Sequence, residues 1–107
     1  MTDDELVGGF ETGLLAPERF GHREHLRLAW CYLTRFGRDD TERKLLAGLR
    51  AFAARAGKPD KFDAALTSAW VGVLADASAQ LGYPATFDTL IAARPDLLDS
   101  ATVRARR

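Results

Sequence analysis

The chain has 107 residues, of which 47% are hydrophobic and 28% are charged, and its 15 Lys and Arg balance its 15 Asp and Glu. This composition is typical of a globular protein, and the lack of a run of about 18 apolar residues excludes a membrane-spanning helix. The balanced charge leaves no excess to neutralise a phosphate backbone or an anionic membrane surface, so neither nucleic acid nor a membrane is an expected partner.

Length and composition also predict the architecture. One domain, residues 1–107, is expected because independent domains usually take on the order of 100 residues or more. The chain has 18 Ala and 15 Leu but only 4 Val and 1 Ile, and this excess of strong helix formers over β-branched residues favours an all-α fold. Because the connections are short, we expect a single-domain bundle of four to five helices, without strands.

The first predicted helix lies before Pro17. Its apolar residues Leu6, Phe10 and Leu14 are four positions apart, as on one face of a helix. The next helix, over residues 22–36, is apolar on most sides and is therefore expected to be central in the fold. It contains the only cysteine, Cys31, whose apolar neighbours favour a packing role.

Glycines mark the ends of the second and third predicted helices. Gly37 ends the helix over 22–36, and Asp39 with Glu42 three residues later predicts a capping arrangement for the third helix. This helix ends at Gly57, in the position where helices commonly have glycine. Its predicted apolar stripe consists of Leu45, Leu49, Phe52 and Ala56.

Two more helices follow Pro59. Asp60 is the predicted N-cap of a fourth helix from Lys61 to about Leu81. Thr86 is the predicted cap of a short last helix that contains Phe87, Leu90 and Ile91 and lies before Pro95. The chain then ends in a basic segment, residues 100–107, which we expect to be solvated and flexible. The acidic segment 1–5 lacks the layout of a secretory signal, and a lone cysteine forms no internal disulfide, so we expect a cytoplasmic protein.

Two histidines open the most apolar helix. His22 and His25 are three residues apart, so they share one helix face with Cβ atoms roughly 5–6 Å apart. The same stripe continues through Ala29 and Leu33, which predicts that both rings face the core. Such a pair can bind one metal ion, or one ring can orient the other for proton transfer. The alternative is structural, since a histidine in a first helical turn often only bonds a nearby loop or carboxylate.

Asp63 is the candidate third member of this site. Two histidines and one carboxylate form a known ligand set for zinc in hydrolysis and for ferrous iron in oxygen chemistry. Helical steps from Asp63 lead to Thr67 and Trp70, and these two residues, with Trp30, are the predicted ligand-binding residues. The alternatives are that the tryptophans belong to the core and that Asp63 stabilises a helix N-terminus, an effect of about 0.3–1 kcal/mol.

The segment Phe20-Gly21-His22-Arg23-Glu24-His25-Leu26-Arg27-Leu28-Ala29 resembles the F-x-H-x-x-H-L-R-x-A motif of a family of small, largely uncharacterised bacterial helical proteins. The resemblance extends from Phe10 to about Asp99. A later K-Y-H-x-T-like motif of that family is similar to Lys61-Phe62-Asp63-Ala64-Ala65, with Asp63 in place of the third histidine. The family's three-histidine pattern implies a polar site between the second and fourth helices, at His22, His25 and Asp63.

Two functions follow as expectations. The first is a small cytoplasmic enzyme or ligand-binding protein that acts on a small organic molecule at the site of His22, His25 and Asp63. In its metal-assisted form, these three residues are catalytic and also bind a divalent metal, Zn or Fe. The second is a non-catalytic interaction module, a homodimer or a binder of another protein, in which the histidines are structural and the helix over 22–36 forms part of the interface.

Overall fold

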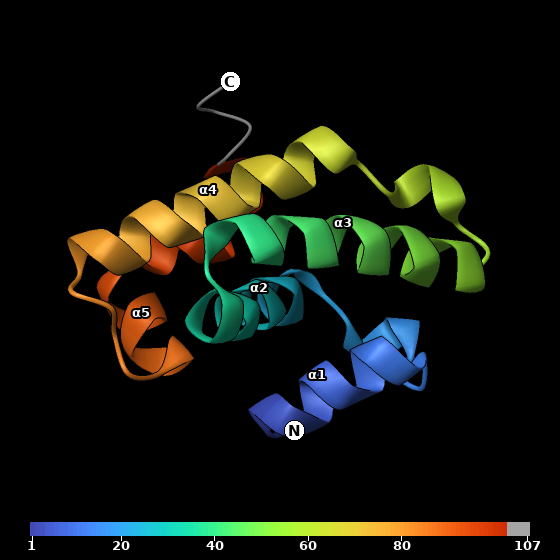
Figure 1. Cartoon of the computed structure of the whole chain (residues 1–107), viewed down its shortest axis with the longest axis horizontal. Helices are drawn as coiled ribbons and strands as arrows, with labels where there is room; N and C mark the ends of the chain where they lie inside the picture. Colours follow the sequence, from blue (N-terminus) through green and yellow to red (C-terminus); the bar gives the residue numbers. More distant parts are fainter. Residues whose placement is uncertain (103–107) are drawn as a thin grey trace.

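Five α-helices and three short 3₁₀ turns form residues 1–102, the part of the chain that the structure, a computed structural model, describes (Figure 1). The α-helices are α1 (Asp3–Thr12), α2 (His22–Phe36), α3 (Arg38–Arg55), α4 (Ala64–Gln80) and α5 (Phe87–Ala93). The 3₁₀ turns are η1 (Pro17–Arg19), η2 (Pro59–Lys61) and η3 (Pro95–Leu98). These residues form no strand, so the predicted all-α bundle is confirmed. Of the predicted basic segment, residues 103–107 lie outside the described part.

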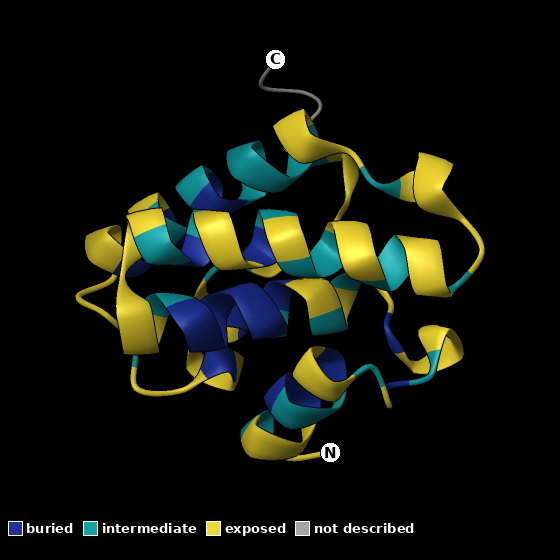
Figure 2. Ribbon diagram, turned by 45° about the vertical axis from the view of Figure 1, so that its right-hand side comes forward, coloured by how far each residue is buried: buried dark blue, intermediate teal, exposed yellow. Residues whose placement is uncertain are grey.

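Helix α2 is the central element. It contacts α1 on one side and α3, α4 and η3 on others, and Figure 1 shows it between α1 and the α3–α4 pair. Figure 2 shows buried residues over much of α2, whereas α3 has an exposed outer face. The prediction of a central helix is therefore confirmed. Burial of a large apolar side chain stabilises a fold by about 1.5–3 kcal/mol, so α2 contributes strongly to stability. The buried residues of α2 are Leu26, Leu28, Ala29, Trp30, Cys31 and Tyr32.

Charged side chains attach α1 to α2. Arg27 donates to Asp3 at 2.6 Å, and Arg35 donates to Asp4 at 2.7 Å. The hydroxyl of Tyr32 donates to a carboxylate oxygen of Glu11 at 2.9 Å, and burial together with this bond raises the pKa of the tyrosine. These bonds fix the orientation of α1 against the central helix, although exposed ion pairs contribute little to stability.

The first helix is shorter than predicted. Thr2 and Glu5 form a capping box at its start, and Gly13 ends it with a left-handed φ of 79°. Leu6 and Phe10 are buried as the spacing predicts, but the assignment of Leu14 to the same stripe was wrong, because the helix ends before it. Leu14 is 84% exposed.

A single residue joins α2 to α3. Gly37 has φ 81°, a conformation that favours glycine, and it is both the C-cap of α2 and the N-cap of α3. The prediction that Asp39 caps the third helix was therefore wrong, because the helix already begins at Arg38 and Asp39 lies in its first turn. The negative charge of Asp39 still stabilises α3, because it interacts favourably with the positive end of the helix dipole.

The fourth helix begins three residues later than predicted. Residues 59–61 form the turn η2, and the extended residue Phe62 separates this turn from α4. The N-cap is Asp63, whose Oδ1 accepts from the backbone N–H of Leu66 at 2.9 Å, so the prediction of Asp60 was wrong. At the last helix the prediction is confirmed, since Oγ1 of Thr86 accepts from the backbone N–H of Thr89 at 3.1 Å.

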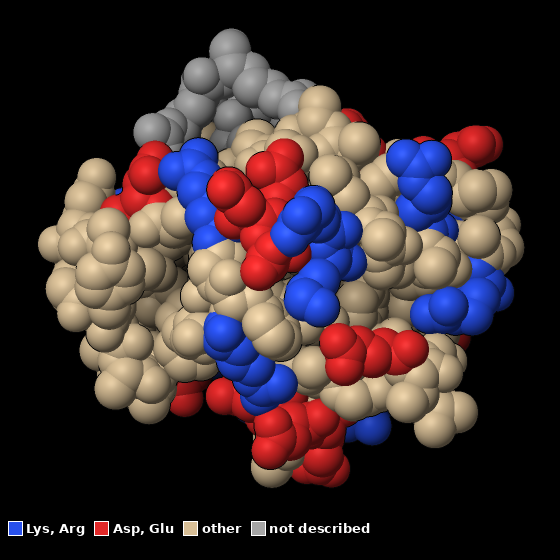
Figure 3. Space-filling view, viewed as in Figure 1, with Lys and Arg blue, Asp and Glu red and all other residues tan. Residues whose placement is uncertain are grey.

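Charges of both signs are interspersed on the face of the molecule that Figure 3 shows. Figure 3 shows Lys and Arg interspersed with Asp and Glu in the middle of one face, whereas the end with the α4–α5 connection is largely free of charge. None of the helices formed by residues 1–102 has both the length and the hydropathy needed to cross a lipid bilayer.

Helices α1 and α3 pack closely at Gly48, which gives a first testable prediction. A Cβ atom at Gly48 would lie 2.6 Å from Cε2 of Phe10, a ring that is itself buried against Phe20 and Phe52. We expect Gly48→Ala to lower the free energy of unfolding by about 1–3 kcal/mol because this ring has no free space to move into. Urea unfolding monitored by circular dichroism measures the change.

Gly8 provides the matched control for this substitution. It lies inside α1, and a Cβ atom there meets nothing within 4 Å. Gly8→Ala is therefore expected to raise the free energy of unfolding by about 0.5–1 kcal/mol. If both substitutions stabilise the protein equally, the close packing of α1 on α3 is disproved.

Candidate functional site

A pocket of about 410 Å³ opens beside the first turns of α2. Its other walls come from the second half of α3, the α3–α4 connection with η2, and the first half of α4, with Ser100 at its edge. Most of the surface inside is apolar. The apolar lining residues of α2, of α3 with its C-cap, and of α4 are Leu26, Leu28, Ala29, Leu45, Leu49, Phe52, Ala53, Ala56, Leu66, Trp70, Val71 and Leu74.

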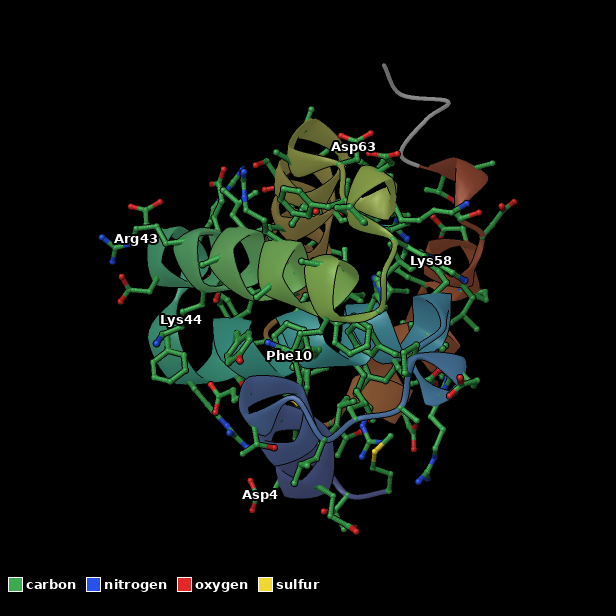
Figure 4. The ribbon with its side chains drawn as sticks, turned by 90° about the vertical axis from the view of Figure 1, so that its right-hand side faces the viewer. Asp4, Phe10, Arg43, Lys44, Lys58 and Asp63 are labelled. Carbon is green, nitrogen blue, oxygen red and sulfur yellow. The ribbon has the colours of Figure 1, made fainter. Side chains whose placement is uncertain are left out.

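Small side chains and a detour of the backbone account for the open space. Ala29, Ala53 and Ala56 line the pocket with single methyl groups, which leave volume that larger residues would fill. Between α3 and α4 the chain does not turn back at once but passes through η2, as Figure 4 shows where it labels Lys58 and Asp63. The wall formed by this connection adds the ring of Phe62.

His22 is held by specific contacts at one side of the pocket. Its Nε2 lies 3.0 Å from the carbonyl oxygen of Leu97 in η3, and this nitrogen must donate because a carbonyl only accepts. The ring also meets the edge of Trp70 with centroids 4.9 Å apart. These contacts favour the structural interpretation of His22, since one nitrogen already joins the start of α2 to η3.

His25 has a different environment. Its ring packs on Phe20 with centroids 4.0 Å apart, and within residues 1–102 neither ring nitrogen makes a hydrogen bond. The side chain is exposed to solvent at the pocket, although Phe20 covers one part of its ring. Partial loss of hydration, with His22 adding to the effect, lowers the pKa of His25 from 6.5 to about 4. At neutral pH the ring is uncharged and offers one N–H donor and one nitrogen acceptor to the pocket.

Asp63 lies at the exposed edge of the same pocket. Its carboxylate caps α4 by accepting from the backbone N–H of Leu66, and its backbone carbonyl accepts from the hydroxyl of Thr67 at 2.9 Å. His22, His25 and Asp63 therefore line one pocket, but the aspartate and Thr67 are both used in local helix capping. The interpretation of Asp63 as a helix-terminal residue accounts for these contacts.

The predicted metal site is not assembled. Over residues 1–102, no three His, Cys, Asp or Glu side chains form a group that could hold a metal ion. His22 donates Nε2–H to the carbonyl of Leu97, and Oδ1 of Asp63 accepts from the backbone N–H of Leu66.

The two tryptophans have separate environments. Trp70 is half-buried and lines the pocket, and Thr67 lines it as well. Trp30 does not line the pocket; it is buried at 6% exposure and packs towards Phe87 of α5, with centroids 6.3 Å apart. The prediction of Trp30 as a ligand-binding residue is thus corrected in favour of the core.

Several lining residues were not identified from the sequence. Lys58 and Lys61 flank Pro59 in the α3–α4 connection and line the pocket, together with Phe62. Their place follows from the path of the connection, which helical periodicity does not describe. Phe52 was assigned to the core stripe of its helix, and it packs on Phe20 with centroids 4.8 Å apart while its exposed part lines the pocket.

Comparisons with protein-family models, with curated proteins and with solved structures find no match to this chain. The geometry of the pocket is therefore the basis for any inference about function.

The lowered pKa of His25 predicts a pH dependence of stability. As pH falls from about 6.5 to about 4, the unfolded chain binds a proton at this residue before the folded chain does. The free energy of unfolding should therefore decrease over this range, and His25→Gln should remove that part of the decrease. Urea unfolding of both proteins at several pH values measures it.

Because the carboxylates titrate in both proteins, the difference between them isolates His25. NMR titration of the ring Cε1–H gives an independent value of its pKa. A midpoint near the ordinary value of 6.5, or an equal loss of stability in both proteins at low pH, would disprove the partial loss of hydration at this ring.

Proposed function

We propose that this protein binds a small organic molecule in the pocket between α2, α3 and α4. The observation that carries the proposal is an apolar pocket of about 410 Å³ into which one imidazole, that of His25, offers unpaired nitrogens. Small-molecule sites in proteins commonly have volumes of about 300–1,000 Å³ and combine apolar walls with a few polar groups that orient the ligand. The pocket lies at the lower end of this range, which favours a small ligand.

His25 is proposed as the polar group that orients the ligand. Its position is defined because the ring packs on Phe20, and Phe20 in turn packs on Phe10 and Phe52. An apolar surrounding strengthens each hydrogen bond that forms within it. A ligand hydroxyl, carbonyl or N–H group that reaches His25 would therefore gain both affinity and a fixed orientation.

The same geometry favours binding over catalysis. A general base is most effective when its pKa is near the working pH, and the pKa of His25 is about 4. His22 donates Nε2–H to the carbonyl of Leu97, and the carboxylate of Asp63 caps α4. Of the three residues predicted to be catalytic, His25 is thus a weak base, and His22 and Asp63 already have hydrogen-bond partners within the protein.

The alternative of an interaction module has less support. Helix α2 was expected to form part of the interface, but six of its residues are buried, and it packs against α1, α3, α4 and η3 of the same chain. Phe36, at the end of this helix, is exposed.

Binding of N-phenyl-1-naphthylamine, a neutral apolar dye that fluoresces in apolar surroundings, tests the proposal. We expect saturable binding with one site per chain. Ala53→Phe should weaken it by about 10-fold or more, equivalent to about 1.4 kcal/mol, because the added ring would occupy the pocket. Ala51→Phe is the matched control, since Ala51 lies on the same helix, is exposed and does not line the pocket.

The two tryptophans locate the bound dye. Energy transfer from Trp70 should persist in Trp30→Phe and fall strongly in Trp70→Phe, because only Trp70 lines the pocket. Failure of the folded protein to bind the dye, or equal binding by the two alanine variants, would reject the proposed function.

A further inference from the structure

We propose that the ligand of this pocket is an organic monocarboxylate, with its apolar body among the side chains of α2, α3 and α4 and its carboxylate at the opening beside Lys58 and Lys61. This inference rests on the proposed function and adds the chemical class of the ligand. It follows from the distribution of charge around the pocket.

The charged residues that line the pocket are Lys58, Lys61 and Asp63. Both lysines are exposed, and neither ammonium group has an ion pair or a hydrogen bond to another residue in the range 1–102. The carboxylate of Asp63 already accepts from the backbone of Leu66. The opening thus has an excess of positive charge and two unpaired donors, although the protein as a whole has a net charge of zero.

The free lysines contrast with most of the arginines within residues 1–102. Arg23, Arg27, Arg35, Arg38, Arg43 and Arg94 each have an aspartate partner. Outside the pocket wall, the guanidinium of Arg50 lies 5.0 Å from the ring centre of Phe62 and adds a further cation, while Asp60 lies within η2 but does not line the pocket. A bound carboxylate would give the lysines the partner that the protein itself does not supply.

The interior limits the charge to one end of the ligand. Beyond the opening, the walls are mostly leucine, alanine and aromatic side chains, and a second charged group among them would lose its hydration without gaining a partner. The imidazole of His25 can bond one neutral polar group. A cationic ligand is disfavoured because it would meet Lys58 and Lys61 at the opening.

Three eight-carbon probes test the inference on the full chain. Octanoate, 1-octanol and octylammonium have the same apolar body and differ only in the head group. Their affinities can be measured through competition with N-phenyl-1-naphthylamine, below the concentrations at which they aggregate. We expect octanoate to bind about 10-fold more tightly than octanol, from two ion pairs at an exposed opening, and octylammonium to bind most weakly.

Variants of the two lysines assign the preference to the opening. Lys58→Gln with Lys61→Gln should bring octanoate to within about 2-fold of octanol and leave the affinity for octanol unchanged, and replacing both by arginine should keep the preference. Lys44→Gln is the matched control, because Lys44 lies over the ring of Phe36 at 4.6 Å and does not line the pocket (Figure 4). The preference should also decrease with added salt, which screens exposed charges.

The outcomes separate the two proposals. Equal affinity for the three probes, or tightest binding of octylammonium, would overturn the carboxylate inference and leave the binding function intact. A preference for octanoate that survives in the double glutamine variant would also overturn it. If neither the dye nor any of the probes binds the folded protein, the proposed function itself is rejected.

Discussion

Burial of α2 is the constraint on which the rest of the fold depends. Its apolar side chains point in several directions, and transferring them from water requires cover on each of those sides. Helix α1 provides this cover on one side, and α3, α4 and η3 provide it on others. At the first turns of α2, however, the α3–α4 connection passes around the helix without filling the space beside it. The pocket is the place where the cover of the central helix is incomplete.

The polar residues at this end of α2 differ in whether their side chains have hydrogen-bond partners within the protein. Glu24 accepts from the backbone N–H of Gly21 at 3.1 Å, His22 donates to Leu97, and Arg27 donates to Asp3. His25 has only ring packing. The side chain is exposed at the pocket, where solvent reaches it, and the protein around it lowers its pKa by disfavouring the charged form. Among these four residues, only His25 lacks a hydrogen-bond partner within residues 1–102.

Helical periodicity predicted the features that depend on neighbours in sequence. It identified the central helix and the shared face of His22 and His25, and residue type identified the cap at Thr86. The caps at Asp39 and Asp60 were misassigned because Gly37 and Asp63 compete successfully for the same role a few residues away. The carbonyl that fixes His22 and the path that brings the lysines to the opening depend on contacts far apart in the chain, which no local pattern encodes.

The two tryptophans show why a site on a helix bundle needs both spacing and packing. Trp30 and Trp70 both occupy apolar stripes, so the sequence makes them equivalent, yet α5 covers Trp30 through Phe87 while no helix covers the exposed part of Trp70 in the pocket. Position in the bundle, and not residue type, therefore separates a core residue from a lining residue. The same reasoning applies to charge, because Lys58 and Lys61 lie beside an open apolar space only through the path of the α3–α4 connection.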